Sequence, residues 1–250
     1  EEMELRLIRP QDMSRYVEKG VVDAGLTGAD WVAENESDVT VVTELVYAKQ
    51  KLTPVRWVVA VPEDSPVQSV EDLEGKRIST ELVNVTRNYL KERGIKAEVE
   101  FSHGATETKA PDLVDAIVEL TETGTSLKAN DLRIVEEVME STTQFIACNE
   151  SYEDEWKRKK ITDLARLLQS TITAKSKVGL KMNVSPGKLD EVVELLPALG
   201  EPTLSSLAHK SGYAVEAVVN ESETRELIPR LIRAGATGII EYSLNKVVPT

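Results

Sequence analysis

Cysteine and histidine are scarce in this sequence, and their scarcity excludes several kinds of site. Among 250 residues there is one cysteine, Cys148, so no disulfide can form within the chain. It lies in a mostly apolar run, which favours a small buried thiol. The two histidines, His103 and His209, lie far apart and without other metal-ligating residues nearby, which argues against a zinc site built by the protein. We interpret each histidine as a loop residue.

Long apolar runs are also missing. No uninterrupted apolar stretch is long enough to span a bilayer, and the sequence does not open with a basic segment followed by an apolar one. A cytoplasmic location is therefore predicted.

Positive charge is in short supply as well. The chain has 30 Lys and Arg against 43 Asp and Glu, a formal net charge of -13. Binding to a nucleic acid depends on clustered Lys and Arg that neutralise its phosphates, so this balance argues against such a partner. A local basic pocket for a small phosphorylated ligand is still compatible with it.

Residues 114–130 are the most informative stretch that the sequence does contain. They begin as an apolar run with acidic residues at Asp115 and Glu119, pass through a turn at Gly124, and end in helix-forming residues, which predicts a strand, a loop and a helix start. The loop carries the hydroxyl side chains of Thr123, Thr125 and Ser126. Backbone N–H groups and hydroxyls in this arrangement can hold an oxyanion such as phosphate. An ordinary turn with Ser/Thr caps explains the same pattern about equally well.

Two other predicted strands end in similar polar loops. Residues 21–26 run into Thr27-Gly28-Ala29-Asp30, and residues 97–101 run into a loop over 102–107. In open parallel sheets, ligands bind where such strand ends meet. The alternation of strands and helices predicts two lobes, each with a parallel sheet, and a ligand cleft between them.

The predicted domain boundaries follow from turn-forming residues and from a change of pattern. Residues 1–64 and 131–172 are assigned to a first lobe, residues 65–130 to a second, and residues 176–250 to a separate domain. The order of elements in this last domain is βαββαβ, the ferredoxin-like arrangement, which often carries an amino-acid effector in small regulatory modules. The fold alone does not establish that role.

Several segments resemble the ATP phosphoribosyltransferases, in the order in which that family has them. They are Arg9–Asp12, Gly20–Asp30, Gly104–Glu107, Asp115–Asn130 and Gly235–Ile240. Since they extend from residue 9 to residue 240, the resemblance covers essentially the whole chain. It implies an α/β enzyme of the long form, with a two-lobed catalytic part like a periplasmic binding protein and a C-terminal ferredoxin-like regulatory domain.

The resemblance implies a pentosyltransferase reaction in the first step of histidine biosynthesis. N1 of ATP would displace pyrophosphate from C1 of phosphoribosyl pyrophosphate to give phosphoribosyl-ATP, with Mg2+ bound mainly to the pyrophosphate. One departure is that the family's Pro-Lys-Gly-Arg-Leu-like loop, expected well before Arg9, has no counterpart. We therefore expect that a natural N-terminal segment, with cationic contacts to the pyrophosphate, precedes this sequence.

The same resemblance assigns roles to individual residues. The ribose 5-phosphate would be bound by Glu122, Thr123, Gly124, Thr125, Ser126 and Leu127. Asp115 is the first candidate for contacts to the ribose hydroxyls, and Glu119 is a second catalytic candidate on the same face of the strand. Arg9, Thr27, Gly28, Asp30 and Glu107 would place ATP. Helix capping and surface salt bridges are the competing explanations for these residues.

In the C-terminal domain, five positions match the family's pocket for histidine, the expected feedback inhibitor. They are Asn183, Leu199, Thr203, Ala217 and Val218. A homo-oligomer of dimers that assemble into hexamers is also expected. Two alternatives to an active enzyme remain at this stage: a non-catalytic two-lobed sensor of anions or amino acids, and a regulatory protein with a degenerate catalytic part. The carboxylates of Asp115 and Glu119 beside a phosphate loop argue against the sensor.

Overall fold

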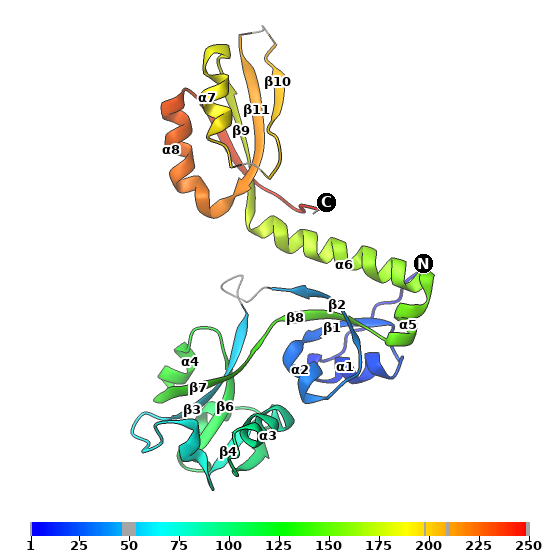
Figure 1. The fold of residues 1–250 in the computed structure, drawn as a ribbon, viewed down its shortest axis with the longest axis vertical. Helices are drawn as coiled ribbons and strands as arrows, with labels where there is room; N and C mark the ends of the chain where they lie inside the picture. The colour runs from blue at the N-terminus through cyan, green and yellow to red at the C-terminus, as the bar shows by residue number, and fades with distance from the viewer. Residues whose placement is uncertain (1, 47–53, 198, 209–210, 249–250) are drawn as a thin grey trace. The chain divides into compact units, whose positions relative to one another are not determined.

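The computed structural model describes residues 2–46, 54–197, 199–208 and 211–248 of the chain. The chain divides into two compact units, Glu1–Ala165 and Arg166–Thr250. Figure 1 shows two sheets in the first unit and one in the second. His209, which was predicted to lie in a loop, falls outside the described residues. None of the helices in the described ranges is long and apolar enough to cross a membrane.

The first lobe is built on a three-stranded sheet in the order β1-β8-β2. Its elements are α1 Pro10–Glu18, β1 Ala24–Gly28, α2 Ala29–Glu34, β2 Thr40–Leu45 and β8 Thr143–Ala147. Met13 and Val17 on α1 pack with Ile146 on β8 in its core. Both strand pairs are antiparallel, so the prediction of a parallel sheet is wrong for these strands. The reason is that β8, the strand that returns from the second lobe, lies between β1 and β2 and runs opposite to both.

The second lobe is a five-stranded sheet in the order β5-β4-β6-β3-β7. Its elements are β3 Val55–Pro62, η1 Val70–Leu73, β4 Arg77–Thr80, α3 Val83–Glu92, β5 Glu98–Phe101, η2 Thr106–Thr108, β6 Ala116–Thr121, α4 Thr125–Ala129 and β7 Leu132–Ser141. β4 is parallel to β5 and β6, whereas β3 is antiparallel to β6 and β7. This sheet extends beyond residues 65–130 at both ends, because an apolar pattern does not reveal which sheet a strand joins.

The parallel strands β4, β5 and β6 end at the same edge of this sheet. Both faces of the sheet are covered by apolar side chains: Tyr89 and Leu90 of α3 belong to the core on one face, and Leu127 of α4 packs with Val58 and Ile117 on the other. The loops after β5 and β6 come together at the edge where these strands end.

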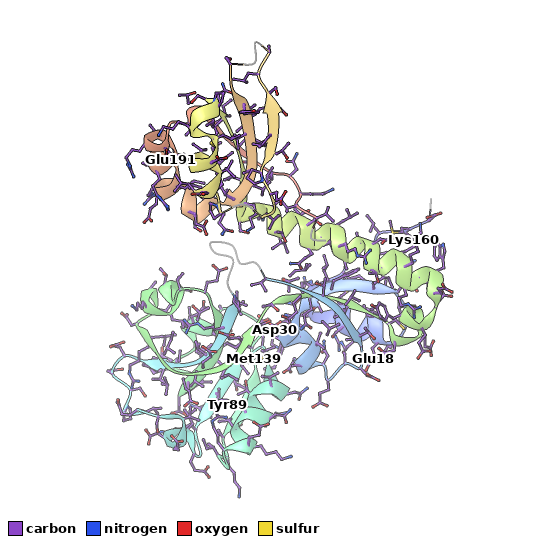
Figure 2. All side chains as sticks on the ribbon, turned by 45° about the horizontal axis from the view of Figure 1, so that its top comes forward. Glu18, Asp30, Tyr89, Met139, Lys160 and Glu191 are labelled. Carbon is purple, nitrogen blue, oxygen red and sulfur yellow. The ribbon has the colours of Figure 1, made fainter. Side chains whose placement is uncertain are left out.

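Two carboxylates on α2 connect the first lobe to the second. Asp30 accepts a hydrogen bond of 2.8 Å from the indole Nε1 of Trp57 on β3. Glu34 accepts hydrogen bonds of 3.0 Å from the backbone N–H groups of Asn84 and Val85, in the first turn of α3. Such N–H groups have no acceptor within their own helix, and the positive end of the helix dipole favours a carboxylate. Figure 2 labels Asp30 at this junction.

The C-terminal unit has the predicted ferredoxin-like fold. The elements from the end of the first lobe onward are α5 Asn149–Glu153, α6 Glu155–Lys175, β9 Lys177–Val184, η3 Pro186–Lys188, α7 Leu189–Glu194, β10 Thr203–Ser206, β11 Tyr213–Asn220, η4 Glu221–Glu223, α8 Thr224–Ala234 and β12 Thr237–Ser243. The sheet order is β10-β11-β9-β12, and every pair is antiparallel. Leu180, Val215 and Leu231 form part of the core between the sheet and its helices. α7 and α8 lie on one face of this sheet (Figure 1).

Candidate functional site

The loop after β6 has a defined shape that its own residues maintain. Gly124 has a φ of +75°, a left-handed conformation that residues with a side chain rarely adopt. Its N–H donates to the hydroxyl Oγ1 of Thr121 at 2.8 Å, which closes the turn directly before α4. Leu127, a residue of α4, is buried and packs against core residues of the sheet, which anchors this short helix. The predicted strand, loop and helix start are all confirmed.

The hydroxyl groups of this loop lie at the surface, as binding of an oxyanion requires. Thr123 and Thr125 share a hydrogen bond of 2.8 Å between their Oγ1 atoms, and the Ser126 hydroxyl donates to Glu107 Oε1 at 2.8 Å. All three hydroxyl-bearing residues are exposed, whereas Glu122 is half-buried. The first N–H groups of α4 have no acceptor within the helix. The loop can therefore offer both hydroxyls and N–H groups to a phosphate.

Glu119 lies near the end of β6, half-buried and close to this loop. Its carboxylate accepts a hydrogen bond of 3.0 Å from the backbone N–H of Leu120, and the nearby hydroxyl of Thr106 lowers its pKa. Burial raises the pKa of Glu119, and the nearby carboxylates of Glu107 and Glu81 add to that rise. A carboxylate in this position can accept hydrogen bonds from sugar hydroxyls or stabilise positive charge on a ligand held by the loop.

Asp115, in contrast, lies at the opposite end of the same strand. Its carboxylate accepts the backbone N–H of Arg77 at 2.9 Å, and its Oδ1 is 3.8 Å from Lys76 Nζ. The loop begins at the far end of β6, roughly 20 Å away at the usual rise of a strand. We therefore correct the assignment of Asp115: side chains on one face of a strand can lie too far apart along it to share a ligand.

The residues predicted to place ATP divide into two groups. Arg9 and Gly28 come together with Thr27, whose hydroxyl donates to the Pro10 carbonyl at 2.7 Å. Arg9 is exposed at the N-cap of α1, but Thr27 is only 2% exposed and Asp30 only 5%. Both oxygens of the Asp30 carboxylate accept hydrogen bonds within the protein. The predicted ATP contacts of the Thr27 and Asp30 side chains are therefore revised, since burial leaves neither accessible.

Glu107 belongs with the phosphate loop, because it accepts the hydrogen bond from Ser126 and lies near Glu119. Four residues that the sequence did not single out join the same cluster: Ser79, Ser102, Thr106 and Lys109. Ser102 and Thr106 lie in a loop recognised as polar, but hydroxyl residues are too common for their partners to be predicted. Lys109 is a single cation that follows this loop closely in sequence.

The described residues do not form a ready-made metal centre. Within residues 2–46, 54–197, 199–208 and 211–248, no three His, Cys, Asp or Glu side chains are grouped as metal ligands. The carboxylates of Glu107 and Glu119 and the Ser126 hydroxyl are nevertheless oxygen donors of the kind that Mg2+ prefers. They fit an ion that is bound mainly by the phosphates of a ligand.

The predicted effector positions in the C-terminal unit do not all face the same side of its sheet. Asn183 and Val218 alternate with core residues of β9 and β11 and therefore point away from the helices. Thr203 pairs with Glu216 and shares that side, and Leu199, 59% exposed, donates its N–H to the Val218 carbonyl at 2.9 Å. Ala217 is only 5% exposed and lies in the core, so its side chain is removed from the predicted pocket.

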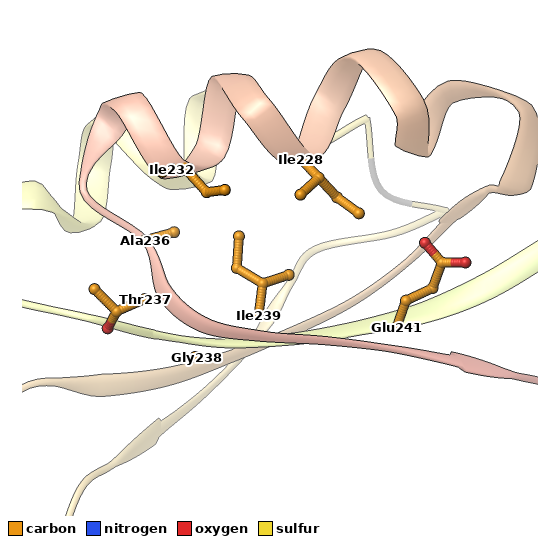
Figure 3. A pocket seen from close by; sticks show the side chains of 7 residues that line it. All are labelled: Ile228, Ile232, Ala236, Thr237, Gly238, Ile239 and Glu241. Atoms are coloured by element: carbon orange, nitrogen blue, oxygen red, sulfur yellow. The ribbon is translucent and has the colours of Figure 1, made fainter.

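A separate apolar groove of about 490 Å³ lies between α8 and β12. Figure 3 shows Ile228 and Ile232 on the helix facing Ile239 on the strand. Its lining residues are Ile228, Ile232, Ala236, Thr237, Gly238, Ile239 and Glu241. The groove offers few polar groups and includes none of the predicted effector positions, so it does not match a pocket for histidine.

Comparisons with known proteins indicate the same family along nearly all of the chain. The ATP phosphoribosyltransferase family model (HisG) matches residues 9–170, and the model of the HisG C-terminal domain matches residues 174–246. The ATP phosphoribosyltransferase of Thermodesulfovibrio yellowstonii is 57% identical over 100% of this chain and 85% of its own length. That of Chlorobaculum parvum is 56% identical over 99% of this chain and 84% of its own.

A solved structure is similar in fold. It is the ATP phosphoribosyl transferase (HisG:HisZ) complex from Thermotoga maritima, in which one chain is 30% identical with a TM-score of 0.58. The similarity covers 67% of this chain and 78% of that chain.

Proposed function

Because the chain belongs to the ATP phosphoribosyltransferase family, we propose that the loop after β6 binds the ribose 5-phosphate and that Glu119 acts on the reacting ribose. The reaction joins N1 of ATP to C1 of phosphoribosyl pyrophosphate and releases pyrophosphate. The non-catalytic sensor considered from the sequence is not favoured. One observation supports our assignment most directly: a half-buried carboxylate lies beside a hydroxyl-rich loop at the end of a parallel strand.

The proposed role of Glu119 follows from the charge that develops during the transfer. As pyrophosphate leaves C1, the ribose ring acquires positive, oxocarbenium-like character, which a fixed carboxylate stabilises. Partial burial strengthens this interaction, because fewer water molecules screen it. The loop contributes by holding the 5-phosphate so that C1 stays close to Glu119.

We propose that Mg2+ enters with phosphoribosyl pyrophosphate, held mainly by the substrate. Glu107, Glu119 and the Ser126 hydroxyl would supply the oxygen ligands from the protein. When bound, the ion neutralises part of the negative charge on the pyrophosphate. Among the predicted ATP residues, the exposed guanidinium of Arg9 and the backbone at Gly28 remain accessible in the first lobe, so we assign them to ATP.

The test of the activity is direct. Incubation of the protein with ATP, Mg2+ and phosphoribosyl pyrophosphate is expected to produce phosphoribosyl-ATP and pyrophosphate in equal amounts, measured by chromatography. Inosine triphosphate, which carries a proton on N1, is the matched control and should not react. Absence of product at every substrate concentration would contradict the enzyme and leave the two alternatives, a non-catalytic sensor and a regulatory protein with a degenerate catalytic part.

Gly124→Ala is expected to weaken binding of ribose 5-phosphate about tenfold, because forcing a side chain into the left-handed conformation costs roughly 1–2 kcal/mol and shifts the loop. Space is not the obstacle, since the added methyl would lie 3.6 Å from Ile134 Cδ1, an ordinary contact. Calorimetric titration measures the affinity. Gly94→Ala is the matched control, with a φ of +74° at the end of α3 and nothing within 4 Å. An equal loss of affinity in both variants would contradict the assignment of the loop.

We propose that histidine inhibits the enzyme by binding to the helix-free face of the C-terminal sheet. Asn183 and Thr203 have polar side chains on that face, and Val218 and the exposed Leu199 can form an apolar wall. The pairing of β9 with β11 brings Asn183 opposite Ala214, whose small side chain leaves room beside it.

Asn183→Ala should raise the histidine concentration needed for half-inhibition about tenfold or more, since it removes hydrogen bonds to a charged ligand. Turnover without histidine should stay within about twofold, because Asn183 belongs to the C-terminal unit and the residues assigned to the reaction belong to the N-terminal unit. Asp190→Ala, an exposed position in α7 on the other side of the sheet, is the control. Identical inhibition curves for wild type and Asn183→Ala would rule out this pocket.

We also propose a cytoplasmic homo-oligomer, built from dimers that associate into hexamers. The cytoplasm is where ATP is plentiful, and the family leads to the expectation of oligomers. Sedimentation velocity with and without histidine measures the assembly. A monomer under all conditions would contradict it.

A further inference from the structure

The N-terminus of α2 is fixed to the strand that crosses between the two lobes. The N–H of Ala29 donates to the Thr142 carbonyl at 2.9 Å, and the N–H of Asp30 donates to Ser141 Oγ at 3.2 Å. Ser141 ends β7, and Thr142 is the single residue between β7 and β8, where the chain returns from the second lobe to the first. The start of α2 therefore cannot move independently of this crossing.

The C-terminal end of α2 is joined to α3 of the second lobe by hydrogen bonds in both directions. The Glu34 carboxylate accepts the backbone N–H of Asn84 through Oε1 and that of Val85 through Oε2, both at 3.0 Å. In return, Asn84 Nδ2 donates to the backbone carbonyl of Glu34 at 2.9 Å. Helix ends lack partners for these N–H and carbonyl groups within their own helix. The end of α2 and the start of α3 thus satisfy each other.

The six residues of α2 link two parts of the proposed active site. Gly28, which we assign to ATP, directly precedes α2. At the other end, α3 begins shortly after β4. The last residue of β4, Thr80, pairs with Val118, the neighbour of Glu119 on β6. One short helix therefore runs from the backbone proposed to bind ATP to the segment that follows the strand beside the reacting ribose.

We propose that Glu34 is a positioning residue, which fixes the two lobes relative to each other so that bound ATP faces C1 of the bound ribose. The reacting atoms must lie about 3–3.5 Å apart, and a displacement of about 1 Å costs on the order of 10²-fold in rate. Glu34 is half-buried, whereas Asp30 is only 5% exposed. Loss of the Glu34 carboxylate therefore releases α3 without emptying a buried site. The proposal rests on the assignment of ATP to the first lobe and of the ribose phosphate to the second.

Glu34→Ala removes both bonds to the N–H groups of α3. We expect kcat to fall about tenfold or more, because the two substrates are no longer held in register. The affinity for ribose 5-phosphate alone should stay within about twofold, because the loop after β6 belongs wholly to the second lobe. Glu34→Gln keeps one acceptor oxygen and should recover part of the loss in kcat. Asn88→Ala and Glu92→Ala, at exposed positions in α3, are the controls and should keep the wild-type rate.

A second readout does not depend on activity. Nitroxide labels on Lys19→Cys, directly after α1, and on Lys91→Cys, in α3, report the distance between the lobes by pulsed electron paramagnetic resonance. The labels are placed in a Cys148→Ala background, and labelled chains are diluted with an excess of unlabelled ones so that only distances within one chain are measured. The distance distribution should be broader in Glu34→Ala than in wild type. Glu92→Ala should match wild type.

An unchanged distance distribution in Glu34→Ala would overturn the proposal. So would a broader distribution with a wild-type kcat, since the lobes would then be free without harm to the reaction. If the wild-type protein itself formed no phosphoribosyl-ATP, the proposed function would fail. The distance distributions would still decide whether Glu34 fixes the lobes.

Discussion

Glu119→Gln is expected to lower turnover about 10²- to 10³-fold, the usual loss when a fixed charge next to a developing charge is removed. The amide keeps the shape of the side chain and an oxygen that can accept the Leu120 N–H. Steady-state kinetics with saturating ATP and phosphoribosyl pyrophosphate measure the effect. The KM for ATP should change little, because Glu119 is assigned to the ribose.

The pH dependence of the wild-type enzyme provides an independent check. Since burial raises the pKa of Glu119, the rate should decline as the pH falls through that raised pKa and the carboxylate gains a proton. The contribution of Glu119 to the free energy of unfolding changes with pH in the opposite direction. A folded pKa above the unfolded one means that the fold favours the protonated form, and that this stabilisation is lost as the pH rises through the folded pKa. Glu119→Gln should therefore be at least as stable as wild type at neutral pH.

Asp115→Asn is the matched control, an acid-to-amide change on the same face of the same strand. Its carboxylate has a partly exposed lysine at 3.8 Å and one backbone hydrogen bond, so we expect turnover within about threefold of wild type. If Asp115→Asn lost as much activity as Glu119→Gln, the ligand would have to contact the other end of β6. The placement of the ribose beside Glu119 would then be wrong.

Asp30→Ala is expected to destabilise the N-terminal unit by about 3 kcal/mol, because it leaves two N–H donors without their acceptor. These are the indole Nε1 of Trp57, at 2.8 Å, and the backbone N–H of Trp31, at 3.0 Å. The methyl side chain also leaves a space where the buried carboxylate was. Since Trp57 belongs to the core of the second lobe, the loss should weaken the connection between the two lobes.

Tryptophan fluorescence during urea unfolding measures this effect. All three tryptophans, Trp31, Trp57 and Trp156, lie in the N-terminal unit, so their signal follows that unit and not the C-terminal one. Asp64→Ala, at an exposed position after β3, is the control and should stay within about 0.5 kcal/mol of wild type. A stable Asp30→Ala variant with impaired ATP binding would restore the original assignment of Asp30 to ATP.

The phosphate loop illustrates how much of the site could be predicted from sequence. Gly124 and its flanking hydroxyls predicted a strand, a turn and a helix start, and the structure confirms all three. The prediction of these three elements was correct because the interactions that form them are local, such as the hydrogen bond from Gly124 N to Thr121 Oγ1. The same is true of the C-terminal domain, whose βαββαβ pattern matches the observed sheet.

Where a residue's role depended on distant partners, the sequence was a poor guide. Asp30 looked like a polar residue at a strand exit, but Trp57, 27 positions later, binds its carboxylate. Asp115 and Glu119 looked equivalent in the sequence, because every second side chain of a strand points to the same face and these two residues are four positions apart. Only the position of the loop at one end of β6 separates them.

The sequence by itself determined the two-part organisation of the chain and the loop of residues 122–127, because apolar periodicity and short-range turn chemistry depend on neighbouring residues. Its motifs, in their order along the chain, indicated the family by resemblance. Tertiary structure alone decided that β8 lies between β1 and β2, and that Asp30 is buried at the junction of the lobes. It also decided that Lys109 donates a hydrogen bond to the buried hydroxyl of Ser102, which is hydrogen-bonded to Thr106. The physical reason is that strand pairing, burial and hydrogen-bond direction depend on which distant segments pack together, and no local pattern encodes that choice.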